Sequence, residues 1–244
     1  GVYISDSDVS LIRTNISRNH AQWGGGISAE NSHLILRFTT LIDDSASGSG
    51  GGVYLNNVDL NARRFNGFNN VAALDGGGLF ATGGSDVVIR LLMLNGNRAN
   101  LGGALCFSDS STIQLNNGNI NLNNAENGGG IWASAVTGTI GAVRFQNNTA
   151  ENLGGSFHLS NNSHLVATDM VVIERYDSDG RTKATPTGTV ATMTDWLTRF
   201  EVDAKDTRLN GHVHLGDGTL NGDLWDRSVY FNANVSSHVI PGQD

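Results

Sequence analysis

The chain has very little proline, a single cysteine and a small share of charged residues. Of its 244 residues, 2 are Pro and 1 is Cys, and Asp, Glu, Lys and Arg together make up 16%. A lone cysteine, Cys106, excludes a disulfide framework within the chain, so stability must come from packing and hydrogen bonding. The low charge argues against a disordered protein, and the 32 Gly argue against a helical one.

Basic residues and long apolar runs are also scarce. Lys and Arg total 15 against 23 Asp and Glu, which gives a net charge of −8 and disfavours nucleic acid as a partner. No apolar run reaches the length of a membrane-spanning helix, so we expect no membrane span. Because the chain begins at Gly1 without Met and shows no signal peptide, we interpret it as a processed chain or a fragment.

A repeat of about 26 residues fills the first two-thirds of the sequence. Its first mark is a Gly-Gly pair followed by a residue that is mostly apolar. This mark occurs at Gly25-Gly26-Ile27, Gly51-Gly52-Val53, Gly77-Gly78-Leu79, Gly102-Gly103-Ala104, Gly129-Gly130-Ile131 and Gly154-Gly155-Ser156, and Val2 fits the same column. We expect the Gly pairs to supply a corner with positive φ.

A second column places Asn or Asp two positions ahead of Ala in every repeat. Its members are Asn19, Asp44, Asn70, Asn97, Asn123 and Asn148. Stacked copies of one side chain can form a hydrogen-bonded ladder, so we predict an amide ladder along this column. Asn also tolerates the left-handed backbone conformation, so we expect these residues to form a second corner of the repeat.

Between these marks the repeats carry short alternating stretches that suit strands of 3 to 5 residues, such as 32–36, 86–89 and 112–115. Several short strands in each repeat predict an all-β fold, a right-handed parallel β-helix of about seven coils. A β-sandwich with Gly and Asn in its loops is the alternative. It would not keep both columns in phase over six repeats.

The pairing of an apolar-x-x-Asn-x-Ala stretch with Gly-Gly-Ile resembles the repeats of chlamydial polymorphic outer membrane proteins and related autotransporter-like adhesins. The similarity is clearest at 145–150 and at Gly129-Gly130-Ile131, and it covers about residues 1–170. Members of that family are extracellular passengers or surface-attached proteins. The resemblance therefore implies a secreted or cell-surface location.

The repeat marks stop near residue 175, so we divide the chain into three parts. Residues 1–175 are the β-helix, 176–195 are a loop rich in Thr, Gly and Asp, and 196–244 form either irregular final coils or a small β cap or assembly segment. An uncovered coil end is a template for pairing with another chain. We therefore expect end-to-end self-association, which propagates without closing.

The position after each Gly-Gly-apolar mark holds mostly large side chains. The column reads Tyr3, Ser28, Tyr54, Phe80, Leu105, Trp132 and Phe157. If the preceding apolar residues point inward, strand alternation turns this column outward, where aromatic rings can stack on sugars or contact a partner. We predict a ligand or partner face at Tyr3, Tyr54, Phe80, Trp132 and Phe157. The alternative is that the phase is wrong and these rings belong to the core.

No metal or cofactor is expected. His212 and His214 share one strand face, but no third ligand stands at a recognisable spacing, so both are interpreted as exposed histidines. The segments Asp177-Ser178-Asp179-Gly180 and Asp217-Gly218 are similar to calcium loops. The first lacks the remaining carboxylates of such a loop, so ordinary Asp-Gly turns are favoured over calcium sites.

An enzyme acting on polysaccharides is the least favoured function. Hydrolysis needs two carboxylates at catalytic separation, and Asp43 and Asp44 are the only adjacent pair within the repeats. The leading hypothesis is a structural or adhesive protein, as a filament or sheath subunit or an adhesin passenger. The second is a carbohydrate-binding module that uses the aromatic column.

Overall fold

The structure, a computed structural model, describes residues 1–168 and, beyond them, the backbone of short strands between 171 and 237. Side chains are described as far as residue 166. The described residues are all β and contain no helix, so no helix among them has the length and apolar character that crossing a bilayer requires.

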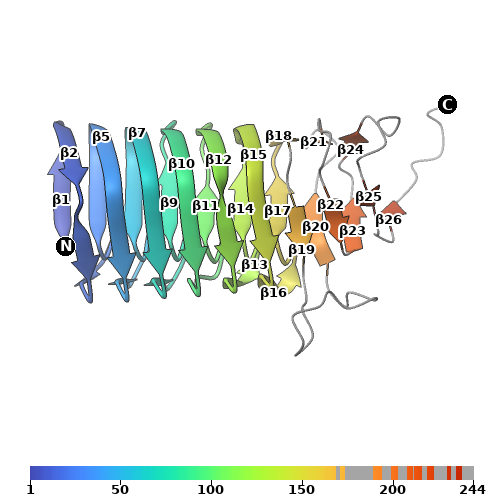
Figure 1. Cartoon of the computed structure of the whole chain (residues 1–244), viewed down its shortest axis with the longest axis horizontal. Coiled ribbons are helices and arrows are strands. Elements are labelled where there is room, and N and C mark those ends of the chain that lie inside the picture. The colour runs from blue at the N-terminus through green and yellow to red at the C-terminus, as the bar shows by residue number, and fades with distance from the viewer. Residues whose placement is uncertain are drawn as a thin grey trace.

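The chain winds into a β-solenoid of about six turns, each of about 26 residues, and this confirms the predicted stack of parallel coils. Every strand pairs in parallel with the equivalent strand of the next coil, so like positions lie directly above one another. Figure 1 shows the coils in order along a rod, with the N-terminus at one end.

Each coil has three main strand segments, which in some coils run together into one long strand. The first segment is formed by β1 (Val2–Ser5), the start of β5 (Ile27–Ile42) and of β7 (Val53–Phe68), β9 (Leu79–Thr82), β11 (Leu105–Phe107), β14 (Ile131–Ser134) and β17 (Phe157–Ser160). The second is formed by β2 (Asp8–Ile12), the middle of β5 and β7, β10 (Asp86–Asn95), β12 (Thr112–Asn121), β15 (Thr137–Gln146) and β18 (His164–Thr168). The third follows in β3 (Asn15–Ser17) and in the ends of β5, β7, β10, β12 and β15.

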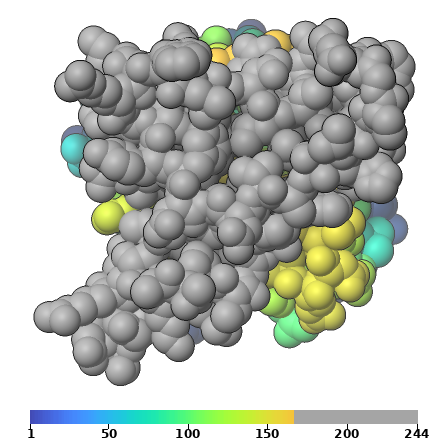
Figure 2. Space-filling view, turned by 90° about the vertical axis from the view of Figure 1, so that its right-hand side faces the viewer, coloured from blue at the N-terminus to red at the C-terminus, as the bar shows by residue number. Residues whose placement is uncertain are grey.

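A short fourth side closes each coil. Its strands are β4 (His20–Ala21), β6 (Ser45–Ala46), β8 (Val71–Ala72), β13 (Asn124–Asn127) and β16 (Thr149–Leu153). In the view from the C-terminal end, the yellow residues near 150–165 are the described residues seen most fully, with parts of earlier coils in green, cyan and blue at the rim (Figure 2).

The corners of the coil are made by residues with positive φ. The corner before the Asn column is formed by the residue ahead of each Asn, namely Arg18, Asp43, Asn69, Gly96, Leu122 and Asn147. The prediction that the column residues themselves take the left-handed conformation was therefore wrong. Turning one residue earlier lets the Asn side chains point into the coil, where they contact their own copies.

The Gly-rich corner is more regular than the Gly-Gly marks indicate. Its residue with positive φ recurs every 26 positions, at Gly24, Gly50, Gly76, Gly102, Gly128 and Gly154. Ala104 and Ser156 stand where the other coils have a third Gly, so the predicted phase was one residue early in those two coils. Leu105 and Phe157 are consequently the first inward residues there.

The core is a set of apolar columns that run the length of the stack. One column consists of Ile27, Val53, Leu79, Leu105, Ile131 and Phe157, all with no exposed surface. Burial of each such side chain stabilises the fold by roughly 1.5–3 kcal/mol relative to exposure. Each member contacts its copies above and below, so the core is continuous from coil to coil.

Beyond residue 168 the described strands continue the same parallel pairing. They are β19 (Val171–Ile173), β20 (Thr189–Met193), β21 (Arg199–Val202), β22 (Arg208–Asn210), β23 (His212–Leu215), β24 (Thr219–Gly222), β25 (Tyr230–Phe231) and β26 (Val235–Ser237). β20 pairs with β17, β23 with β20 and β26 with β23. β20 lies inside the segment predicted as a loop, most of which is outside the described residues. The predicted boundaries at 175 and 195 stay predictions.

Candidate functional site

The Asn column lies inside the coil beside the third strand segment and forms a chain of hydrogen bonds along the axis. Nδ2 of Asn70, Asn97 and Asn123 donates to Oδ1 of the next member at 2.9–3.1 Å. The backbone N–H of the same residues donates to that same Oδ1 at 2.9–3.1 Å. Asn70, Asn97 and Asn123 have no exposed surface. Each rung thus satisfies buried donors that water cannot reach.

The second hydrogen of Nδ2 joins the ladder to the preceding coil at Asn70, Asn97, Asn123 and Asn148. Asn70 donates to the carbonyl of Leu41 at 3.2 Å and Asn148 to that of Ile120 at 2.8 Å. The amides of Asn70, Asn97 and Asn123 therefore tie their own coils to both neighbours. This arrangement explains why the column repeats in the sequence.

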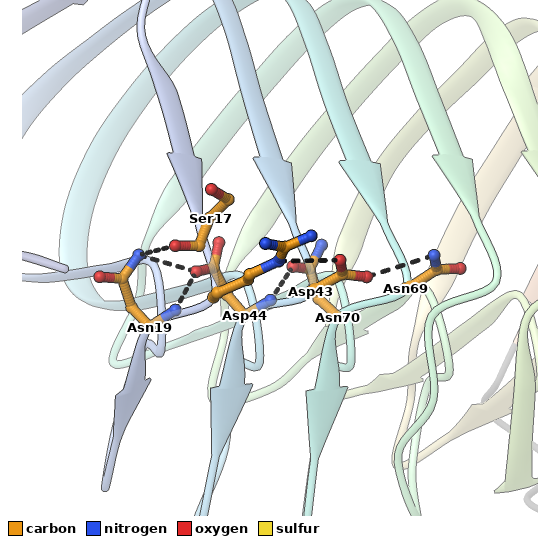
Figure 3. Close-up of polar contacts among 7 residues, drawn as sticks. Ser17, Asn19, Asp43, Asp44, Asn69 and Asn70 are labelled. Atoms are coloured by element: carbon orange, nitrogen blue, oxygen red, sulfur yellow. Dashed lines mark hydrogen bonds and ion pairs between the residues drawn. The ribbon is translucent and has the colours of Figure 1, made fainter.

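Asp44 is the member that interrupts this pattern (Figure 3). Its Oδ1 accepts from the backbone N–H and Nδ2 of Asn19 at 2.8 and 2.9 Å. Its Oδ2 is buried without a hydrogen-bond partner, beside Gly26, in the place that Nδ2 of Asn70 takes beside Gly52. An oxygen stands where the ladder requires a donor.

The predicted aromatic face is only partly present. Tyr3 is 68% exposed, and Tyr54, Phe80 and Trp132 are half-buried on the outer side of the first strand segment. Phe157 is fully buried and packs against Phe145, with ring centroids 4.4 Å apart, so the face must leave it out. The one-residue phase error explains this result: Cys106 and His158 take the outward positions that were assigned to Leu105 and Phe157.

The remaining rings pack on one another along the axis. Trp23 contacts Tyr54 at 5.4 Å between centroids, and Tyr54 contacts Phe80 at 5.7 Å, both tilted. Trp132 stacks on His158 at 6.3 Å. Burial, and to a smaller extent the charge of Glu30, raises the pKa of the Tyr54 hydroxyl. Much of the ring surface is therefore used within the protein.

His158 and Cys106 are the buried titratable groups of this column. Nδ1 of His158 has no hydrogen-bond partner, and burial lowers the pKa of its imidazole to about 4. Burial also raises the pKa of the Cys106 thiol, with smaller contributions from Asp75 and Asp109. A neutral imidazole and a protonated thiol are structural groups here, because neither is exposed to a reactant.

The outer side of the second strand segment carries charged residues that sequence analysis missed. Asp59 and Asp86 are register partners on neighbouring coils. Oδ2 of Asp59 lies 3.1 Å from Nδ1 of His33, and Oδ1 of Asp86 accepts from the Thr112 hydroxyl at 2.5 Å. The signal was present in their separation of 27 residues, close to the period of the repeat. Asp43 and Asp44, the pair considered in the sequence, diverge instead to the exposed corner and the buried ladder.

Four positions further along the same strands lie three arginines. Arg37, Arg63 and Arg90 are register partners on consecutive coils, and all are exposed. With Asn61, Leu91, Asn116 and Asn117 they line an open hollow of about 700 Å³. These arginines were not among the predicted site residues, although their intervals of 26 and 27 residues match the period of the repeat.

The remaining predicted sites lie largely beyond the described residues. His212 and His214 belong to β23, whose backbone alone is described. The Asp177–Gly180 segment and Asp217-Gly218 are outside the described residues. Among the residues that the structure describes, no group of three His, Cys, Asp or Glu side chains has the arrangement of a metal site.

Comparisons with protein-family models, with curated proteins and with solved structures found no match for this chain.

Proposed function

We propose that the chain is a structural or adhesive protein of the cell surface, a rigid rod that presents binding surfaces along its length. The observation that carries the proposal is the combination of parallel backbone pairing in every coil with a buried amide ladder. Each coil is fixed to its neighbours by backbone bonds, amide rungs and core columns at once. Such a stack resists bending and keeps its outer side chains in register.

The resemblance to polymorphic outer membrane protein and autotransporter-like adhesin repeats supports this proposal and a secreted or cell-surface location. It rests on the apolar-x-x-Asn-x-Ala stretch and on the Gly-rich corner. In the fold, the Asn of the first forms the amide ladder, and the Gly of the second makes the turn with positive φ. End-to-end association of copies, giving a filament or sheath, belongs to the same proposal. Any coil edge that is left uncovered offers a complete row of peptide groups to a second chain.

Electron microscopy combined with light scattering during size-exclusion chromatography tests the assembly. We expect rods that lengthen with protein concentration, with an axial repeat equal to the stacked-coil length of one chain. Limited protease treatment of intact source cells tests the location, and we expect the protein to be cleaved. A strict monomer at all concentrations would refute the filament role, and protection in intact cells would refute the surface role.

A carbohydrate-binding role for the aromatic column is the second candidate. The half-buried Trp132, Tyr54 and Phe80 present the aromatic surface that favours it, although part of each ring packs on a neighbour. Titration with soluble neutral oligosaccharides tests this role. Binding that is lost in Trp132→Ala and kept in Met93→Ala, an exposed apolar control, would support it. Equal binding by both variants would exclude it.

A further inference from the structure

Three arginines of like charge are stacked directly above one another on the outer side of the solenoid. Arg37 pairs in register with Arg63, and Arg63 with Arg90. Neighbouring strands are about 4.8 Å apart, and like charges placed opposite each other on adjacent strands destabilise a sheet. The chain has only 15 Lys and Arg in 244 residues, so this grouping concentrates a scarce charge.

The charges of these arginines are not neutralised within the described part of the protein. None of the three guanidinium groups has a hydrogen bond or ion pair with residues 1–168. The carboxylates of Asp59 and Asp86 are four residues earlier in the same strands, roughly 13 Å along the strand direction. Those carboxylates are already engaged by His33 and Thr112. The guanidinium donors are therefore free for a ligand.

The adjoining corner adds two further guanidinium groups. Arg13, Phe38 and Arg64 occupy one corner position with positive φ in consecutive coils. The guanidinium carbon of Arg13 lies 5.9 Å from the centroid of the Phe38 ring, and that of Arg64 lies 5.0 Å from it. Attraction to the face of the Phe38 ring holds both guanidinium groups close to the protein, at this corner of the coil. Together the five arginines, Arg13, Arg37, Arg63, Arg64 and Arg90, form what we call the arginine stripe.

The stripe has the form of a binding site for a linear chain. It runs along the solenoid axis over four coils, beside a hollow whose lining includes the amides of Asn61, Asn116 and Asn117. Guanidinium groups bind carboxylate or sulfate through paired hydrogen bonds, and amides bind hydroxyl groups. Charges and hydroxyls that alternate along an extended polymer match this lining.

We propose that the arginine stripe binds a linear acidic polysaccharide, whose carboxylate or sulfate groups contact Arg37, Arg63 and Arg90 in consecutive coils. A glycan is favoured over nucleic acid because the net charge of −8 and the flanking Asp59 and Asp86 oppose a densely charged phosphate backbone. The inference rests on the adhesive part of the proposed function and names the chemistry of its partner. It does not require filaments.

Isothermal titration calorimetry of the monomeric fraction tests the proposal with defined probes. We use oligogalacturonate for carboxylates, heparin oligosaccharides for sulfates, dextran oligosaccharides as the neutral control, and a short DNA duplex. We expect binding to at least one acidic glycan that weakens as salt is raised, and none to dextran. The stronger of the two acidic probes identifies the anionic group. Equal binding of dextran, or tighter binding of DNA than of both acidic glycans, would overturn the proposal.

Substitutions then locate the site. In the triple variant Arg37→Gln, Arg63→Gln, Arg90→Gln we expect affinity to fall by about tenfold or more, because charge-assisted hydrogen bonds are lost. Arg63→Lys should lose part of the affinity, because a lysine keeps the positive charge but cannot form the paired hydrogen bonds of a guanidinium group. Arg144→Gln, an exposed arginine outside the stripe, is the matched control and should bind normally.

A thermal melt separates loss of binding from loss of fold. Because the triple variant removes like-charge contacts between exposed groups, it should melt at or above the temperature of the parent chain. Unchanged affinity in the triple variant, or an equal loss in Arg144→Gln, would refute the proposed site. Filament formation by light scattering is scored independently, so failure of assembly and failure of glycan binding are distinguishable.

Discussion

Replacing Asp44 by Asn should stabilise the protein, because it supplies the donor that the ladder lacks at this position. The Oδ2 atom of Asp44 is buried without a partner, and an Asn would place an amide N–H₂ there. Asn70 shows what that amide does: it donates to the carbonyl of Leu41 and to Oδ1 of the next ladder member. An Asn at 44 would donate in the same way to Ile16, the register partner of Leu41, and to Asn70.

The magnitude follows from the cost of an unsatisfied buried polar atom, about 1–3 kcal/mol, which the amide of the new Asn would remove. We expect Asp44→Asn to raise the free energy of unfolding by about 2 kcal/mol in urea titrations followed by circular dichroism. Asp43→Asn is the matched control. Its exposed side chain makes only a 3.9 Å ion pair with Arg18 and a surface hydrogen bond from Asn69, so its change should stay within about 0.5 kcal/mol. An unfolding midpoint for Asp44→Asn at or below the parent's would refute the reasoning.

Three further changes test other parts of the fold. Asn97→Ala removes a ladder member with four hydrogen bonds and strands a buried N–H, so it should lower the free energy of unfolding by about 3–5 kcal/mol in urea titrations. The exposed Asn152→Ala should change it by less than about 0.5 kcal/mol, and equal losses would disprove the ladder's role. Gly76→Ala places a Cβ 2.4 Å from a backbone oxygen and should melt far below Gly84→Ala, where the backbone is also left-handed but no atom lies within 4 Å. His158 is buried neutral with its pKa lowered to about 4, while the unfolded chain takes up the proton near pH 6.5. Its contribution is therefore complete above that pH and is lost as the pH falls toward 4, by up to about 3 kcal/mol. The acid-side slope in urea midpoints should shrink in His158→Phe, and an unchanged slope would contradict the assignment.

The amide ladder and the apolar columns were readable from the sequence because stacking imposes one period on both. Each coil contacts its own copy, so a position that is buried once is buried in every coil, and its residue type recurs. Asn70, Asn97 and Asn123 illustrate this relation. The same logic predicted an all-β solenoid of parallel coils from the Gly-rich corner.

Tertiary structure decided the phase of individual coils and the composition of the outer surfaces. Ala104 and Ser156 replace a Gly without changing the backbone path, so the Gly-Gly mark misplaced Leu105 and Phe157 by one residue. In a strand, a shift of one residue in phase exchanges the inner and outer faces. Phe157, predicted on the surface, therefore lies in the core.

The arginine stripe and the Asp59–Asp86 pair show the other limit of sequence reasoning. Outward positions face solvent and vary more freely in type, so the recurrence of Arg and Asp at these positions extends over only two or three coils. Asp59 and Asp86 are 27 residues apart because the turn at Gly83 and Gly84 is one residue longer, yet the strands bring them into register. The sequence by itself determined the repeat, the buried ladder and the class of fold, because burial constrains residue type. Only the stacking of coils decided which surface charges become neighbours, because that depends on turn lengths and register.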